Sequence, residues 1–179
     1  LGKKMYHDEY GEKNIFVCDS ESASCGETQL AFKAAEWSKQ GLAFEEICRR
    51  LRDYRDKMKT YFVLDNLETL RKNGRLTGIK AVVATTLNIK PVMGSLKGEI
   101  IQLGQAIGSK KALAKMAETI ANEAVQPQER TLMITHCNCK ERAEKVKEMI
   151  LDKIKVKDVV IMDTQGVSSM YANDGGVIV

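Results

Sequence analysis

Hydrophobic residues are concentrated between Thr60 and Met93, in the sequence TYFVLDNLETLRKNGRLTGIKAVVATTLNIKPVM. The continuous apolar run Tyr61–Leu64 predicts a buried strand, and the segment Thr77–Thr86 predicts a buried helix. Between them, Asp65-x-x-Glu68 matches a capping box, which predicts a short helix. We interpret this stretch as one wall of an apolar pocket that holds Arg75 near its polar end.

Strands and helices alternate through the rest of the chain after residue 87. The pattern predicts strands at Asn88–Met93, Glu99–Leu103, Thr131–Thr135 and Asp158–Met162. Further helices are predicted from Ser109 to about Ala124 and after a capping box at Asn138-x-x-Glu141. The last two strands flank a helix and should be parallel, and Pro91 favours an edge position for the first strand. The tail Gly166–Val179 predicts a tight turn between short extended pieces.

In the first 59 residues, the sequence predicts too few strands and helices to form a complete layered architecture. Asn14–Cys18 (NIFVC) reads as a short buried strand. A capping box at Ser24-x-x-Glu27 predicts a helix that ends at Gly41, and a second amphipathic helix runs from about Phe44 to Lys59. One strand with two helices is not a closed architecture, so we expect this region to take sheet neighbours from elsewhere.

Composition and charge exclude several classes of protein. The chain has 179 residues, 44% of them hydrophobic and 29% charged, with a net charge of +4. No basic block is interleaved with aromatic residues, so nucleic acid is not an expected partner. No apolar run reaches the roughly 18 residues needed for stable membrane insertion, and the first residues are not those of a signal peptide. Five irregularly spaced cysteines favour a cytoplasmic protein with free thiols.

Two motifs suggest chemistry, and each has a structural alternative. His136-Cys137-Asn138-Cys139 offers three metal ligands, but no second cluster completes a tetrahedral set, and a strand end leading into a helix explains it better. The polar loop Asp19–Gly26 follows a predicted strand, where open sheets bind ligands, although such a loop can also satisfy its own backbone. No nucleotide fingerprint or catalytic triad is present, so we predict no enzyme activity, no cofactor and no metal.

Arg75 is the strongest single candidate for ligand binding. Its guanidinium carries five donors in a fixed fork, which suits a carboxylate or a phosphate. The alternative is a residue at a helix C-terminus that complements the dipole and pairs with Glu68 or Asp65. The residues alone leave both interpretations open.

The ordered motifs resemble those of the DegV family of bacterial fatty-acid-binding proteins, over nearly the whole chain. Val17-Cys18-Asp19-Ser20, with Ser22, Ser24 and Gly26, is similar to the family's strand and serine loop. Tyr61–Leu67 followed by Gly74-Arg75-Leu76-Thr77 is similar to a second family segment, and Leu87–Val92 (LNIKPV) to a third. The last two, at this spacing, are specific to the family.

The resemblance implies an α/β fold and a carrier that is not an enzyme. Residues 1–59 would be the remnant of a Rossmann-like first domain whose N-terminal part is missing, and residues 60–179 a second, smaller α/β domain with a mixed sheet. The expected partners are a long-chain fatty acid and a fatty acid kinase, to which the carrier presents the acyl carboxylate. A phosphotransfer module related to dihydroxyacetone kinases, using His136 or Asp19, is one alternative. A protein-interaction module docking through the basic face Arg49–Lys59 is another.

The expected ligand-binding residues are Arg75, Tyr171, Ser22 and Ser24. Tyr171 stands where the family has a histidine, in Tyr171-Ala172-Asn173-Asp174-Gly175. A phenol can donate a hydrogen bond to a carboxylate, but it does not titrate near neutral pH as histidine does. The family's basic K-x-R sequence is matched only by Gln105-Ala106-Ile107. These departures predict that the head group makes contacts that differ from those in the family.

Overall fold

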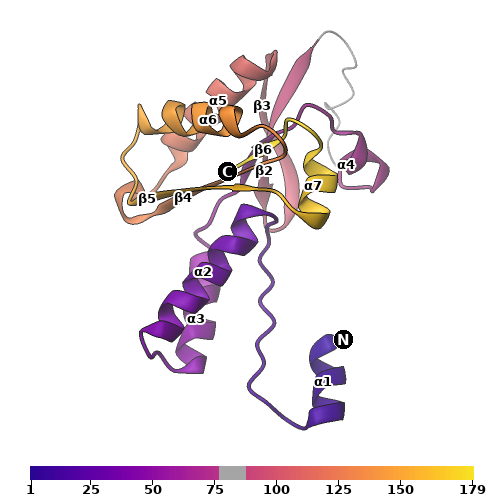
Figure 1. Cartoon of the computed structure of the whole chain (residues 1–179), viewed down its shortest axis with the longest axis vertical. Helices are drawn as coiled ribbons and strands as arrows, with labels where there is room; N and C mark the ends of the chain where they lie inside the picture. The colour runs from indigo at the N-terminus through magenta and orange to yellow at the C-terminus, as the bar shows by residue number, and fades with distance from the viewer. Residues whose placement is uncertain (77–87) are drawn as a thin grey trace.

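A six-stranded mixed sheet organises the protein, seen here in a computed structural model that describes residues 1–76 and 88–179 (Figure 1). The strand order is β3-β2-β1-β6-β4-β5. The strands are β1 (Tyr61–Val63), β2 (Ile89–Leu96), β3 (Glu99–Ile107), β4 (Thr131–His136), β5 (Asp158–Asp163) and β6 (Val177–Ile178). β4 and β5 are parallel, as predicted, whereas the other pairs are antiparallel. The α/β class and the mixed sheet expected from the sequence are therefore confirmed.

Helices lie on both sides of this sheet and below it. They are α1 (Gly2–Tyr10), α2 (Cys25–Lys39), α3 (Phe44–Arg55), α4 (Glu68–Lys72), α5 (Ser109–Glu123), α6 (Lys140–Leu151) and α7 (Gly166–Ala172), with a 3-10 turn at Pro127–Glu129. In Figure 1, α5 and α6 lie on one side of the sheet, α4 and α7 on the other, and the α2–α3 pair extends below it. Among the described residues, no helix has the length and apolar character needed to cross a bilayer.

The alternation of side chains along the strands builds two buried clusters. Tyr61, Val63 and Val177 belong to the cluster beneath α5 and α6. Phe62 and Ile178 belong to the cluster on the opposite face, which also includes residues of α4 and α7. Successive residues of a strand point to opposite faces, so both faces of the central strands are apolar. We call the second face the α4–α7 face.

β6 lies inside the sheet, and the sequence predicts it only as one of the short extended pieces that flank the turn in Gly166–Val179. It pairs with β1 through Phe62–Ile178 and with β4 through Thr135–Ile178. The predicted turn within Gly166–Val179 is present before β6, but the segment ahead of it is helix α7 rather than an extended piece. The two serines of α7 are weak helix formers. Ala172 at the end of this helix is only 2% exposed, and its burial in the core outweighs the weak local preference for a helix.

The predicted strand at Asn14–Cys18 is wrong. The segment has no regular structure, and Val17 is 68% exposed. A strand requires a neighbour for its backbone N–H and C=O groups, and within the described residues this segment is paired with none. The helix α1, which precedes it, was not predicted and buries no residue. The division at residue 59/60 remains a prediction, although Gln29 of α2 reaches across it to donate to the carbonyl oxygen of Thr131 (3.1 Å).

The three predicted capping boxes are also wrong, although each helix exists. No side-chain capping bond is made at the N-cap of α2, α4 or α6. Ser24 and Asp65 instead bind partners far along the chain, and Asn138 adopts a positive φ of 54° one residue before the N-cap. Long-range contacts thus replace the local pattern.

The edge position predicted from Pro91 is wrong as well. β2 lies between β3 and β1, but the short β1 pairs only with its Met93 and Gly94. Pro91 therefore sits beyond the end of β1, where a missing N–H breaks no ladder. The helix predicted at 77–86 lies outside the described residues.

A pair of identical substitutions tests which strand carries the core. Ile134 of β4 is fully buried, whereas Ile107 of β3 is 66% exposed on an edge strand. Ile134→Ala should lower the free energy of unfolding by about 2–5 kcal/mol, because it removes buried methyl groups and leaves a cavity. Ile107→Ala should cost less than about 1 kcal/mol. Urea denaturation measures both, and equal losses would contradict the assignment of the core.

Candidate ligand-binding site

The α4–α7 face combines a buried apolar floor with apolar side chains that remain partly exposed. Met93, Met133 and Leu64 lie in its buried cluster. Five apolar side chains pack against this cluster without being buried: Leu67, Ile100, Val160, Met162 and Tyr171. α4 and α7 over this face are short, with 5 and 7 residues, and α2 contributes only its first residue, Cys25, to the buried cluster. An apolar ligand lying here would contact hydrocarbon and thioether groups.

Serine hydroxyls join the polar loop at residues 19–26 to this same face. Ser22 Oγ lies 2.6 Å from Thr60 Oγ1, and Ser24 Oγ lies 2.8 Å from Thr135 Oγ1. Thr60 directly precedes Tyr61, and Thr135 directly follows Ile134; Tyr61 and Ile134 belong to the cluster beneath α5 and α6. Because successive residues of a strand point to opposite faces, the side chains of both threonines point to the α4–α7 face. The two predicted site serines therefore dock the loop onto the sheet.

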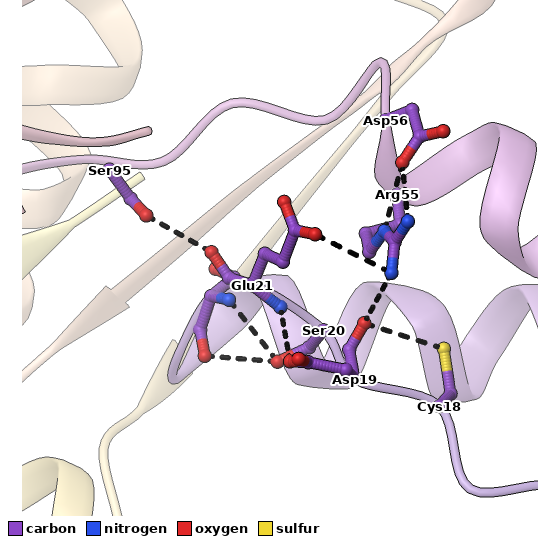
Figure 2. A network of polar contacts seen from close by, with 8 residues as sticks. Cys18, Asp19, Ser20, Glu21, Arg55, Asp56 and Ser95 are labelled. Carbon is purple, nitrogen blue, oxygen red and sulfur yellow. Dashed lines mark hydrogen bonds and ion pairs between the residues drawn. The ribbon is translucent and has the colours of Figure 1, made fainter. Parts of the chain in front are cut away.

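Figure 2 shows how the start of this loop is held. Ser95 Oγ of β2 donates to the carbonyl oxygen of Glu21 (3.0 Å), and Asp19 Oδ1 accepts from the backbone N–H of Glu21 (3.1 Å). Arg55 of α3 donates to the carbonyl oxygen of Asp19 (3.3 Å) and lies 3.6 Å from a carboxylate oxygen of Glu21. The loop is therefore fixed by contacts with both the sheet and α3.

Ser24 has a backbone conformation that residues other than glycine rarely adopt, with φ 57° and ψ −118°. Two residues later, Gly26 packs closely against Ser22, since a Cβ added at Gly26 would lie 2.1 Å from Ser22 Oγ. Such strain persists only where surrounding contacts over-determine it. Here the bond to Thr135 holds the Ser24 hydroxyl against the sheet.

Neither cysteine-containing candidate forms a reactive or metal-binding group. Burial raises the pKa of Cys25 to about 11, so its thiol stays protonated and is a poor nucleophile at neutral pH. His136 is buried, with Nδ1 3.4 Å from both Asp163 Oδ1 and the Cys139 N–H nitrogen. Cys137 and Cys139 contact opposite clusters. Within residues 1–76 and 88–179, no group of three or more His, Cys, Asp or Glu residues is arranged to hold a metal ion.

Arg75 lies at the end of α4 with an exposed side chain. Its backbone N–H donates to the carbonyl oxygen of Leu70 (2.9 Å), which closes the turn after the helix. The two acids considered as its partners bind other cations, since Glu68 pairs with Arg71 (2.5 Å) and Asp65 with Arg142 (2.7 Å). The alternative of a local ion pair at Arg75 is therefore not what the structure shows.

Asn173 connects the element that precedes Arg75 to the helix that carries Tyr171. Its Oδ1 accepts from Thr69 Oγ1 of α4 (3.3 Å), and its Nδ2 donates to the carbonyl oxygen of Asn66 (3.4 Å). α4 and α7 lie next to each other in Figure 1. The structure thus brings the elements of Arg75 and Tyr171 together, while Ser22 and Ser24 dock a separate loop. No hydrogen bond among the described residues joins any two of these four.

The residue that sequence reasoning missed is Asp65. It accepts from Ser109 Oγ (2.6 Å) and from Arg142 (2.7 Å), and the ammonium of Lys90 lies 3.7 Å away. Burial acts to raise the pKa of Asp65, but the hydrogen bonds from Ser109 and Arg142, with the charges of Arg142 and Lys90, bring it below its ordinary value. The signal for this role was available, because an acidic residue directly after a buried strand is a frequent site residue.

Comparison with known proteins identifies the family. The sequence model of the DegV family matches residues 3–179. The chain belongs to the DegV family. A DegV domain-containing protein of Clostridium perfringens is 32% identical over 162 residues, covering 90% of this chain and 56% of its own length. A DegV domain-containing protein of Streptococcus gordonii is 31% identical, and the match covers 99% of this chain and 63% of that protein's length. The chain thus spans about three fifths of the length of these relatives.

Solved DegV structures share the fold. A DegV family protein of Ruminococcus gnavus, whose crystal structure was refined with vaccenic acid, is 51% identical with a TM-score of 0.95 over 99% of this chain and 63% of its own. The Fatty Acid Kinase (Fak) B3 protein of Streptococcus pneumoniae, loaded with linoleic acid, is 29% identical with a TM-score of 0.85. The match covers 98% of this chain and 62% of that protein.

A double-mutant cycle tests the docking of the serine loop. Ser24→Ala and Thr135→Val should each destabilise the protein by about 1–2 kcal/mol, and the double variant by less than the sum, with a coupling of about 0.5–1.5 kcal/mol. Ser24→Ala combined with Thr119→Val should be additive, because Thr119 bonds within α5. Additivity in both pairs, measured by chemical denaturation, would mean that the Ser24–Thr135 bond does not hold the loop.

The lowered pKa of Asp65 predicts a pH dependence of stability. The unfolded chain binds a proton at a higher pH than the folded protein does, so the stabilisation from the charged carboxylate is complete above about pH 3.9. This stabilisation is lost as the pH falls through the pKa of Asp65 in the folded protein, which is lower than in the unfolded chain. The difference in the free energy of unfolding between wild type and Asp65→Asn should therefore shrink below about pH 4. A difference that is constant down to pH 2 in urea titrations would contradict this.

Proposed function

We propose that this protein binds a long-chain fatty acid on the α4–α7 face and presents its carboxylate to a fatty acid kinase, as a carrier rather than as an enzyme. The observation that carries the proposal is the partly exposed apolar face beside Arg75 and Tyr171. The relatives with vaccenic acid and linoleic acid support the same ligand class. A cytoplasmic location fits the five free cysteines and a substrate activated by a kinase.

Burial of the acyl chain would supply most of the affinity. Each methylene removed from water contributes about 0.8 kcal/mol, so roughly ten buried methylenes would supply about 8 kcal/mol before the costs of binding. The methionines Met93, Met133 and Met162 suit such a chain, because an unbranched thioether adapts to irregular apolar shapes. The polar groups then decide which way the ligand lies.

We assign orientation of the carboxylate to Arg75 and Tyr171. The exposed guanidinium of Arg75 offers a fork of donors, and the Tyr171 phenol offers one more. Ser22 and Ser24 are secondary contributors, because each hydroxyl already engages a threonine but keeps further capacity to bond.

The two alternatives have weaker support. The phosphotransfer module needs an accessible acceptor, but the side chain of His136 is only 4% exposed. Asp19 is exposed, but its carboxylate accepts from the backbone N–H of Glu21 (3.1 Å) and stabilises the loop. The docking module needs a positive surface on α3, but Arg49 and Arg50 pair with Glu46, and Arg55 pairs with Asp56. Paired charges at the surface leave little net field for steering a partner.

Binding can be tested in a chimera in which this chain replaces the matching segment of the Ruminococcus gnavus relative. After removal of bound lipid, the chimera should bind a C18 fatty acid, and native mass spectrometry should detect a one-to-one complex. Arg75→Gln should weaken binding about ten-fold, equivalent to about 1.4 kcal/mol, through loss of a charged contact. Tyr171→Phe should weaken it less, because a single neutral donor is removed.

Arg71→Gln is the matched control, since Arg71 is also exposed on α4 but pairs with Glu68. It should leave affinity unchanged. A folded chimera that binds no fatty acid would refute the proposal, and equal effects of Arg71→Gln and Arg75→Gln would remove Arg75 from the site.

A further inference from the structure

Polar side chains from three elements converge on Asp65, which lies two residues after the end of β1. Arg142 of α6 donates to Oδ2 (2.7 Å), Ser109 of α5 donates to Oδ1 (2.6 Å), and Lys90 of β2 donates to the backbone carbonyl oxygen (2.8 Å). The Asp65 side chain is 31% exposed and that of Arg142 is 29% exposed. The pair is thus shielded enough to be strong while still lying at the surface.

The same guanidinium nitrogen of Arg142 also donates to the carbonyl oxygen of Gly175. The backbone at Gly175 is pressed against the pair, since an added Cβ would lie 2.5 Å from Asp65 Oδ2 and 2.9 Å from Arg142 Nη1. Its φ of +83° is a conformation that favours glycine. The Asp65–Arg142 pair therefore fixes the turn at Gly175 by charge, by hydrogen bonding and by close contact.

This turn connects the core to the candidate site. On one side, the N–H of Gly175 donates to the carbonyl oxygen of Cys137 (2.9 Å), which ties the turn to the end of β4. On the other side lie Asn173, which bonds to Thr69 of α4, and Tyr171, four positions before Gly175. Movement of the turn would shift both α7 and its connection to α4.

We propose that the Asp65–Arg142 pair positions Tyr171 and the α4 end that carries Arg75 for the ligand head group, acting through the Gly175 turn. The inference rests on the proposed fatty acid site. The pair is a positioning device, because neither residue belongs to the apolar cluster that forms the ligand face. Its loss should impair recognition of the carboxylate and leave the acyl chain's apolar contacts in place.

Binding of a fatty acid and of the matching fatty alcohol distinguishes a loss of head-group positioning from a general loss of stability. The chimera and its Arg142→Gln variant would be titrated with a C18 fatty acid and with the fatty alcohol of the same chain. Arg142→Gln should weaken binding of the acid about ten-fold and of the alcohol less than two-fold. Arg142→Lys should recover part of the loss, because a lysine keeps the charge but not the planar guanidinium whose Nη1 bonds to both Asp65 and Gly175. Asp65→Asn should weaken binding of the acid and of the alcohol as Arg142→Gln does. The double variant should bind the acid no more weakly than either single variant.

Lys147→Gln is the matched control, because it breaks the Lys147–Glu144 pair on the same helix. It should leave the ratio of acid to alcohol affinity unchanged. An equal loss for both ligands in Arg142→Gln, or an unchanged affinity for the acid, would overturn the inference. If the unmodified chimera binds neither ligand, the proposed function itself fails, which is a distinct result.

Discussion

The hydrogen bonding of β6 on both of its sides is the interaction on which the rest of the structure depends. On one side lies the antiparallel part β1-β2-β3, and on the other the parallel pair β4–β5. The backbone bonds between Tyr61 and Val179, both 2.8 Å, extend the β1 ladder to residue 179. Because β6 alone joins these two parts of the described sheet, both buried clusters depend on it.

The candidate site arises from an asymmetry between the two faces of that sheet. α5 and α6, with 15 and 12 residues, cover one face, whereas α4 and α7 over the other face have only 5 and 7 residues. Short helices bury less apolar surface, so side chains such as Met162 and Tyr171 stay partly exposed. They also need tertiary anchors, which Asn173 and the turn at Gly175 provide. Apolar access and polar anchoring therefore occur at the same place.

Patterns that depend on neighbouring residues predicted much of this fold from the sequence. The hairpin of β2 and β3 and the parallel β4–α6–β5 unit follow from strand periodicity and helix amphipathicity. Residues whose partners are distant in sequence were misjudged. Ser24 and Asp65 matched capping boxes but bind Thr135 and Arg142, 111 and 77 positions away. A two-residue strand such as β6 has too few side chains for any period to appear.

The pairing of β6 also has a consequence for the order of folding. Phe62 and Ile178 are 116 positions apart, so closing this contact orders most of the chain, whereas the hairpin and the β4–α6–β5 unit can form from local contacts. Until β6 inserts, β1 and β4 each present an apolar strand with an unpaired edge. Such edges are templates for pairing between molecules. Newly made or transiently opened chains should therefore be most prone to aggregation through the two strands that later enclose β6.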